Sequence, residues 1–271
     1  MEEEEKGEAV SLTGESGNVS GEMSFWEHLE ELRSTLAICL VSFAGAGTLA
    51  LVFSKPIFEF LRLPLEQASG IPEKETQVLT VMRFMDTFSI LFYIAVLGGI
   101  FFAGPFVLYR LGKFVAPAFS AKERSRLVSF CAVSSGLFLA GAAVAFFWLA
   151  PVSVALPYWI AEHLGLQMNW LAEDYYFFVV ALVLFSGLMF ELPLAVGFLL
   201  YAELVSKETL LEKWRWVLSG ILVCVLVVSP IGDPVALVAF SGLLFGLYLA
   251  AVFVGDFFLK RKTVERSVDY N

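Results

Sequence analysis

Six long apolar runs dominate this chain. They cover about 35–53, 87–109, 127–150, 175–200, 216–229 and 235–254. A helix needs about 20 apolar residues to cross roughly 30 Å of hydrocarbon, so runs of this kind predict membrane-spanning helices. With 58% hydrophobic residues and a mean hydropathy of +0.77, the chain is too apolar for a soluble domain of its size. We therefore predict an all-α, polytopic membrane protein with six transmembrane helices.

The two ends of the chain have a different composition. Residues 1–22 are acidic and rich in Gly and Ser, which predicts a disordered tail. This tail lacks the basic start and short apolar core of a secretory signal peptide, so we expect the apolar segments to remain in the mature protein. The membrane domain is expected over 23–258, followed by a second short tail over 259–271.

The distribution of positive charge predicts the orientation in the membrane. With six spans, the N-terminus, the second and fourth loops and the C-terminal tail share one side, which carries 14 of the 18 Lys and Arg residues. The other four lie in the first outer segment, 54–85. The positive-inside rule therefore places both termini in the cytoplasm and predicts a multi-pass protein of the cytoplasmic (inner) membrane.

Local signals predict where several helices begin and end. Asp86 and Asp174 are the expected N-caps of the second and fourth spans. The third span is expected to stop at Pro151, because proline inside a helix removes a hydrogen bond. Short helices and turns are predicted for 54–85, and the two prolines within 229–234 separate the last two spans.

A short charged helix precedes the first span. Ser24 followed by Glu27 matches a capping box, so we expect a helix to begin near Ser24. The apolar residues of this segment form one stripe, and Glu27, Glu30 and Glu31 lie away from it, with only Arg33 to balance them. The carboxylates either remain solvated at the membrane surface or form a negative patch that attracts a cationic segment.

Glu191 is the ionisable residue placed well inside a predicted span. Burying an unpaired carboxylate in hydrocarbon costs about 2.5–3 kcal/mol or more, so Glu191 should face a cavity or a partner, or be protonated. It could instead be hydrogen-bonded to a neighbouring helix in a purely structural role. Pro193, two residues later, is expected to kink the helix and to free polar backbone beside the carboxyl group.

Cysteines and histidines give no sign of a metal or cofactor site. Cys39, Cys131 and Cys224 all lie in long apolar runs, and His28 and His163 are far apart in sequence. No zinc, haem or disulfide framework is indicated, and we expect no cofactor. No Walker-type motif predicts nucleotide hydrolysis.

Several short motifs occur in an order that matches a known family. They are His28–Arg33, Leu63–Leu65, Phe114–Ala118 with Lys122–Arg124, Phe190–Pro193, and Ser229–Pro230 followed by Asp233. Together they span about residues 24–258 and resemble the TatC family, the multispanning receptor of the twin-arginine translocation system. The resemblance implies a glove-shaped helical bundle.

The resemblance implies roles for particular residues. Glu31 and Glu123 would help to bind the twin-arginine motif of signal peptides, and Arg33 and Phe114 are assigned to the same site. Carboxylates suit this role because they bind guanidinium groups through paired, charge-assisted hydrogen bonds. Glu191 would line the concave face of the bundle and meet a polar group in the transmembrane helix of a TatA- or TatB-type partner.

Two further positions match the motifs of the family. Pro64 and Asp233 correspond to positions generally needed for function, in roles that could be structural. Asp233 is displaced relative to the commoner Pro-Asp arrangement of the family, and Ser34-Thr35 replaces the basic residues that many members have after Arg33.

The leading hypothesis is a non-enzymatic core receptor subunit of the twin-arginine translocase. It would bind signal peptides of folded cargo proteins for proton-gradient-driven export, in a multi-copy complex with TatA- and TatB-type single-span partners and without nucleic acid. The alternative is a proton-coupled small-molecule transporter in which Glu191 carries the proton. An intramembrane enzyme ranks third, because no nucleophile–base pair or metal set is visible in the sequence.

Overall fold

The computed structural model describes residues 25–69, 79–115, 127–166, 170–201, 204–228 and 234–268. Apart from turns and one isolated β-bridge, these residues are helical, which confirms the all-α prediction for them. The elements are α1 (Phe25–Val52), α2 (Ser54–Leu61), α3 (Leu63–Ser69), α4 (Phe84–Val115), α6 (Leu127–Val144), the π-helical turn η2 (Ala145–Leu149), α7 (Ala150–His163), α8 (Ala172–Met189), α9 (Leu192–Tyr201), α10 (Lys207–Glu212), α11 (Trp214–Val228) and α12 (Pro234–Val268).

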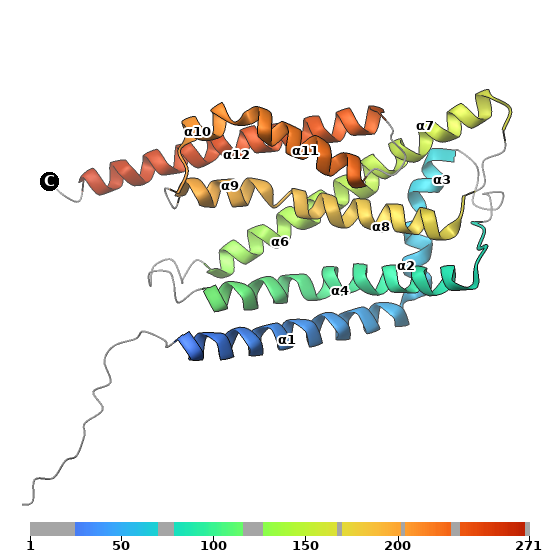
Figure 1. The fold of residues 1–271 in the computed structure, drawn as a ribbon, viewed down its shortest axis with the longest axis horizontal. Helices are drawn as coiled ribbons and strands as arrows, with labels where there is room; N and C mark the ends of the chain where they lie inside the picture. The colour runs from blue at the N-terminus through green and yellow to red at the C-terminus, as the bar shows by residue number, and fades with distance from the viewer. Residues whose placement is uncertain are drawn as a thin grey trace, which may run out of the picture.

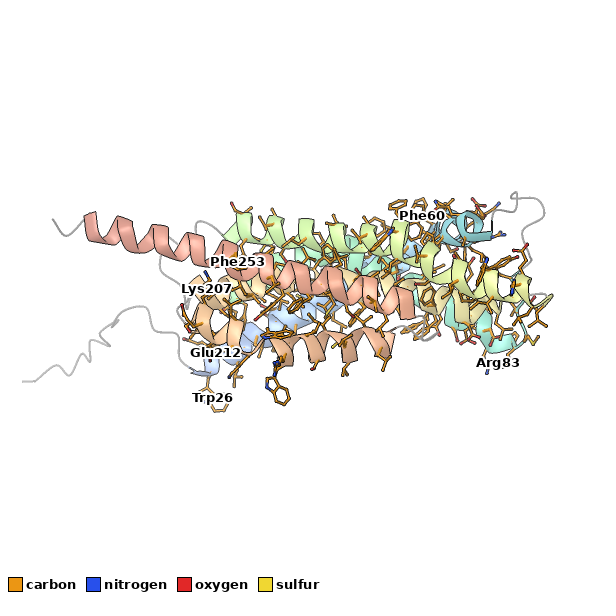
Figure 2. The ribbon with its side chains drawn as sticks, turned by 90° about the horizontal axis from the view of Figure 1, so that it is seen from above. Trp26, Phe60, Arg83, Lys207, Glu212 and Phe253 are labelled. Atoms are coloured by element: carbon orange, nitrogen blue, oxygen red, sulfur yellow. The ribbon has the colours of Figure 1, made fainter. Side chains whose placement is uncertain are left out.

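The long helices lie side by side in an elongated bundle (Figure 1). The first residue of α1 and the last residue of α12 are at one end, which we call the terminal end; α2 and α3 are at the opposite end, which we call the outer end. Arg83 lies at the outer end, and Trp26 and Lys207 lie at the terminal end (Figure 2). The positions of these two helix ends agree with an even number of crossings.

Helix length and composition support a multi-pass membrane protein. Within the described ranges, four helical segments are long and apolar enough to cross a membrane, namely Trp26–Val52, Phe84–Phe114, Val128–His163 and Ala172–Leu200. Two shorter apolar helices, Trp214–Leu226 and Leu237–Phe253, accompany them. At 1.5 Å per residue the 15 residues of α11 extend about 22 Å, less than the roughly 30 Å of a hydrocarbon core.

The helix that begins at Leu127 does not end at Pro151, in contrast to the sequence-based expectation. It passes through η2 and continues as α7 to His163. In η2 the Ala150 N–H donates to the Ala145 carbonyl, five residues back, so the ordinary pattern is already interrupted one residue before the proline. Pro151 then falls in the first turn of α7, where its missing N–H costs little.

Both expected N-caps lie inside their helices. Helix α4 begins at Phe84, and an Asp86 carboxylate oxygen accepts the Arg83 backbone N–H at 3.0 Å, so Asp86 caps from the third helical position. Helix α8 begins at Ala172, which places Asp174 in its first turn. There the carboxylate still complements the positive end of the helix dipole.

Small residues bring α1 and α4 into close contact. A Cβ atom at Gly47 would lie 2.8 Å from the Ala95 carbonyl oxygen, and one at Gly98 would overlap the Ala50 side chain. Membrane helices approach closely where side chains are small, because van der Waals packing replaces the hydrophobic driving force between them. This contact fixes the antiparallel register of α1 and α4 along their length.

Hydrogen bonds join three segments at the outer end. The Tyr175 hydroxyl, on α8, donates to the Leu61 carbonyl of α2 at 2.8 Å, and both residues are buried. Thr80 forms a parallel bridge with Leu171, in which the Ala172 N–H donates to the Thr80 carbonyl at 3.0 Å. The chain leading into α4 is thereby tied to the start of α8.

An exposed arginine adds a polar link at the same end. Arg83 donates to Asp86 and to Glu173 of α8, each at 3.0 Å. The two carboxylates raise the pKa of Arg83 above its ordinary value. Since Arg83 is largely exposed, solvent screens this link and it adds little to stability.

Candidate functional site

At the terminal end, an aromatic stack joins two of the motifs identified in the sequence. The rings of His28 on α1 and Phe114 on α4 lie 4.4 Å apart with an interplanar angle of 12°. The α1–α4 register described above brings these two residues, 86 positions apart, face to face. The predicted site residue Phe114 therefore lies against the charged first turns of α1.

Glu31 lies one turn further along α1 from His28 and has an unsatisfied carboxylate oxygen. The side chain is half-buried, and its Oε2 atom is buried with no hydrogen-bond partner. A buried polar atom without a partner costs about 1–3 kcal/mol, more if charged, so a donor brought to this atom would be bound favourably. Arg33, two residues on, is exposed and points to a different side of the helix.

Arg110, near the end of α4, is a residue near the site that was not predicted from the sequence. Its Nε is buried without a hydrogen-bond partner, and its guanidinium group lies 6.0 Å above the Phe106 ring. By the α1–α4 register it lies at about the level of Glu31. The positive-inside rule accounts for a positive charge at this end of the bundle, but the partial burial of Arg110 distinguishes it from that general role.

One other predicted site residue, Pro64, is not at this end. Pro64 is fully buried in α3, at the outer end. Glu123 and Asp233 lie outside the described residues. The structure therefore unites Glu31 and Phe114, leaves Arg33 on the surface beside them, and assigns Pro64 to packing elsewhere.

Glu191 lies at an interruption between α8 and α9. Phe190 and Glu191 form a turn, and the Glu191 N–H donates to the Leu188 carbonyl, three residues back. The break predicted from Pro193 is present, because proline provides no N–H to continue the helical pattern. The Glu191 side chain is half-buried, and its Oε1 accepts a hydrogen bond of 2.9 Å from Ser134 on α6.

Close packing of α6 and α8 places Ser134 opposite Glu191. A Cβ atom at Gly141 would lie 2.7 Å from the Ser186 carbonyl oxygen, and one at Gly187 would lie 2.6 Å from the Phe138 ring. The Ser186 hydroxyl also donates to the Gly141 carbonyl at 2.9 Å. Ser134 was not identified from the sequence, since a serine in an apolar run has no signal of its own.

Beyond the break, α9 packs on a different partner. Val196 and Leu200 are buried in a small cluster with Tyr248, Ala251 and Val252 of α12. The interruption at Phe190–Glu191 therefore lets one chain segment pack on α6 before the break and on α12 after it (Figure 1). Glu191 lies at the point where the two packing arrangements meet.

The site offers hydrogen bonding and charge without an evident metal centre. Among the described side chains, no three His, Cys, Asp or Glu residues lie close enough together to hold a metal ion. At the terminal end, Glu31 offers a carboxylate oxygen that can accept a hydrogen bond. Glu191 makes a polar contact within the bundle.

Comparison with known proteins gives a consistent result. The profile of the family described as "Sec-independent protein translocase protein (TatC)" matches residues 27–242. A TatC protein of Synechocystis sp. is 29% identical over 85% of this chain and 87% of its own length. The chloroplastic TATC protein of Pisum sativum is 31% identical over 86% of this chain and 64% of its own length.

Solved structures agree with the sequence comparison. A crystal structure described as the twin arginine translocase receptor TatC has a TM-score of 0.72 and 27% identity, and the match covers 85% of this chain and 99% of that one. A second crystal structure of such a receptor, in DDM, has a TM-score of 0.73 and 26% identity. The family profile covers both the helix that carries Glu31 and the break that carries Glu191. This chain therefore belongs to the TatC family of Sec-independent protein translocase proteins.

Proposed function

We propose that this protein is the receptor subunit of a twin-arginine translocase and binds twin-arginine signal peptides at the terminal end of its bundle. The observation that carries the proposal is the buried Oε2 atom of Glu31, which has no hydrogen-bond partner within the described ranges. The α1–α4 contact fixes the position of the helix that carries Glu31. Its unpaired carboxylate oxygen can therefore accept a hydrogen bond from a bound ligand without rearrangement of the helix.

The chemistry of the arginine side chain suits this acceptor. A guanidinium group presents a planar fork of donors that matches a carboxylate, whereas a lysine ammonium group is a point charge without that geometry. The His28–Phe114 stack lies beside Glu31 and offers an aromatic surface on which a guanidinium group can also pack. Glu123 is proposed to provide the second carboxylate.

Glu191 is proposed to meet a polar group in the transmembrane helix of a TatA- or TatB-type partner. Its carboxyl group is half-buried and accepts a hydrogen bond from Ser134, which leaves acceptor capacity for another donor. The termini are proposed to lie in the cytoplasm, where signal peptides are presented. Export is proposed to be driven by the proton gradient, as membership of the TatC family suggests.

The transporter alternative has less support. It rested on Glu191 as a proton carrier, and membership of a protein translocase family favours a role in protein transport instead. Uptake of a small solute that depends on Glu191 in proteoliposomes would be needed to revive it.

Binding of a twin-arginine peptide to the purified protein tests the proposal. Glu31→Gln keeps the size of the side chain and removes its charge, so we expect the affinity for the peptide to fall about 10-fold or more, as for loss of a charge-assisted hydrogen bond. A twin-lysine peptide should bind the original protein as weakly as the twin-arginine peptide binds the variant.

Glu30→Gln is the matched control. Glu30 is a neighbouring, exposed glutamate on the same helix, so this variant removes the same charge at nearly the same place. We expect its peptide affinity to change less than 2-fold at physiological ionic strength, because exposed charges are strongly screened. Equal losses in the two variants would mean that general negative charge, rather than a Glu31 site, attracts the peptide.

A further inference from the structure

A cavity of about 390 Å³ lies at the outer end, away from the proposed signal-peptide site. Its walls come from α2, from the chain entering α4, and from the first turns of α4 and α8. Most of the lining is apolar, including Phe58, Val81, Leu91 and Tyr176. Among the described residues that line it, Arg62 is the one with a charged side chain. The volume falls in the range of about 300–1,000 Å³ found for small-molecule sites.

Arg62 brings an unused positive charge to this cavity. Its Nε is buried without a hydrogen-bond partner, and its side chain takes part in no ion pair with a described carboxylate. Arg83, at the same end, already donates to both Asp86 and Glu173. A buried guanidinium donor without an acceptor is costly, so an anion in the cavity would be stabilised at Arg62 in particular.

The rest of the lining suits a lipid. Thr87, in the first turn of α4, places a hydroxyl group beside the cavity, and the helix starts themselves are already complemented by Asp86 and Asp174. Arg62 is therefore the group of the lining that would bind an anion, while the apolar walls suit a hydrocarbon chain rather than a hydrated ion.

From this combination we infer that the cavity binds an anionic phospholipid, with its phosphate at Arg62 and the start of an acyl chain against Phe58, Leu91 and Tyr176. The cavity lies where the long apolar helices α4 and α8 begin, which is the level of the lipid headgroups for helices that cross a membrane. Phe84, an exposed apolar residue at the same level, is consistent with contact with lipid. A bound lipid would connect α2 to the starts of α4 and α8.

Lipid retention by the purified full-length protein tests this inference. The protein is purified from membranes that contain phosphatidylglycerol, washed in detergent, and analysed for bound lipid by native mass spectrometry. We expect the unmodified protein to retain phosphatidylglycerol. In Arg62→Gln, retention should fall about 10-fold, equivalent to about 1.4 kcal/mol.

Two other variants make the test specific. Val81→Trp fills the cavity from a partly exposed position, so it should lose the lipid without removing any charge. Lys55→Gln removes an exposed positive charge from α2, the helix that ends just before Arg62, and should retain the lipid fully. Retention at the original level in both Arg62→Gln and Val81→Trp would overturn the inference.

Thermal melting of delipidated protein separates a lipid from a soluble anion. Phosphatidylglycerol should raise the melting temperature of the unmodified protein and of Lys55→Gln, but not of Arg62→Gln or Val81→Trp. Inorganic phosphate and phosphatidylcholine should have no such effect. Equal stabilisation by inorganic phosphate would assign the cavity to a soluble anion and overturn the lipid assignment.

Discussion

At the scale of single residues, buried polar atoms without a hydrogen-bond partner distinguish a few positions from the rest of the described bundle. The buried Oε2 atom of Glu31 and the buried Nε atom of Arg62 have no partner among the described residues. Glu191 differs, since its carboxyl group already accepts a hydrogen bond from Ser134. Because unmade hydrogen bonds are costly in an apolar surrounding, the first two should be the more responsive to an added ligand.

Replacing Glu191 tests whether its remaining acceptor capacity serves a partner. We expect Glu191→Ala to reduce crosslinking to the transmembrane helix of a TatA- or TatB-type protein about 10-fold, because the variant has no acceptor for the polar group of that helix. Binding of the twin-arginine peptide should be unchanged, since Glu31 lies at the terminal end.

Ser134→Ala is the comparison for this experiment. It removes the internal hydrogen bond of Glu191 and leaves the carboxyl group in place. We expect crosslinking to decrease less than 3-fold, as for loss of one neutral hydrogen bond. If Glu191→Ala protein instead disappears from the membrane, the carboxyl group has a structural role.

At the scale of elements, glycine positions decide how closely the helices approach. The α1–α4 contact brings His28 against Phe114 and so assembles the terminal end. Gly47 and Gly45 differ sharply in this respect, although they are two residues apart on α1. A Cβ atom at Gly47 would lie 2.8 Å from the Ala95 backbone oxygen, whereas one at Gly45 would meet nothing within 4 Å.

The two glycines therefore predict opposite effects on stability. Gly47→Ala should destabilise the protein by about 1–3 kcal/mol, because the α4 backbone cannot move aside without loss of packing. Gly45→Ala should be neutral or stabilising by up to about 1 kcal/mol, from helix propensity. Thermal unfolding of both variants in the same detergent measures the difference. Equal melting temperatures would mean that α1 and α4 can move apart at little cost in free energy.

At the scale of the whole molecule, the arrangement predicts which residues face each side of the membrane. Trp26 at the terminal end and Met82 at the outer end are 76% and 75% exposed, so a cysteine at either position should be accessible to a reagent. The positive-inside rule assigns the terminal end to the cytoplasm. This assignment is a prediction that labelling can test.

Single cysteines provide that test. In a protein whose Cys39, Cys131 and Cys224 are replaced by Ala, a membrane-impermeant maleimide should label Met82→Cys in intact spheroplasts. It should label Trp26→Cys only after lysis, and both variants in detergent. Labelling of Trp26→Cys in intact spheroplasts would reverse the proposed orientation.

Much of the fold was predictable because it depends on properties local to the chain. The length of an apolar run determines whether a helix can cross hydrocarbon, and Pro193 interrupts its helix wherever that helix packs. The position of Glu191 within an apolar run was also evident from the sequence. Prediction failed at Pro151, Asp86 and Asp174, where a neighbouring π-helical turn or an earlier helix start changed the local hydrogen bonding.

The sequence by itself determined the membrane class, the helical fold, the family and the two glutamates, Glu31 and Glu191, on which function is proposed to depend. Only the tertiary structure decided that Ser134 bonds to Glu191, that His28 stacks on Phe114, and that the Nε of Arg62 has no partner. The physical reason is that partners of polar groups depend on how helices distant in sequence cross and how closely they approach. The length of an apolar run and the missing N–H of a proline, in contrast, affect the structure through neighbouring residues in the sequence, so they can be recognised without knowledge of the tertiary fold.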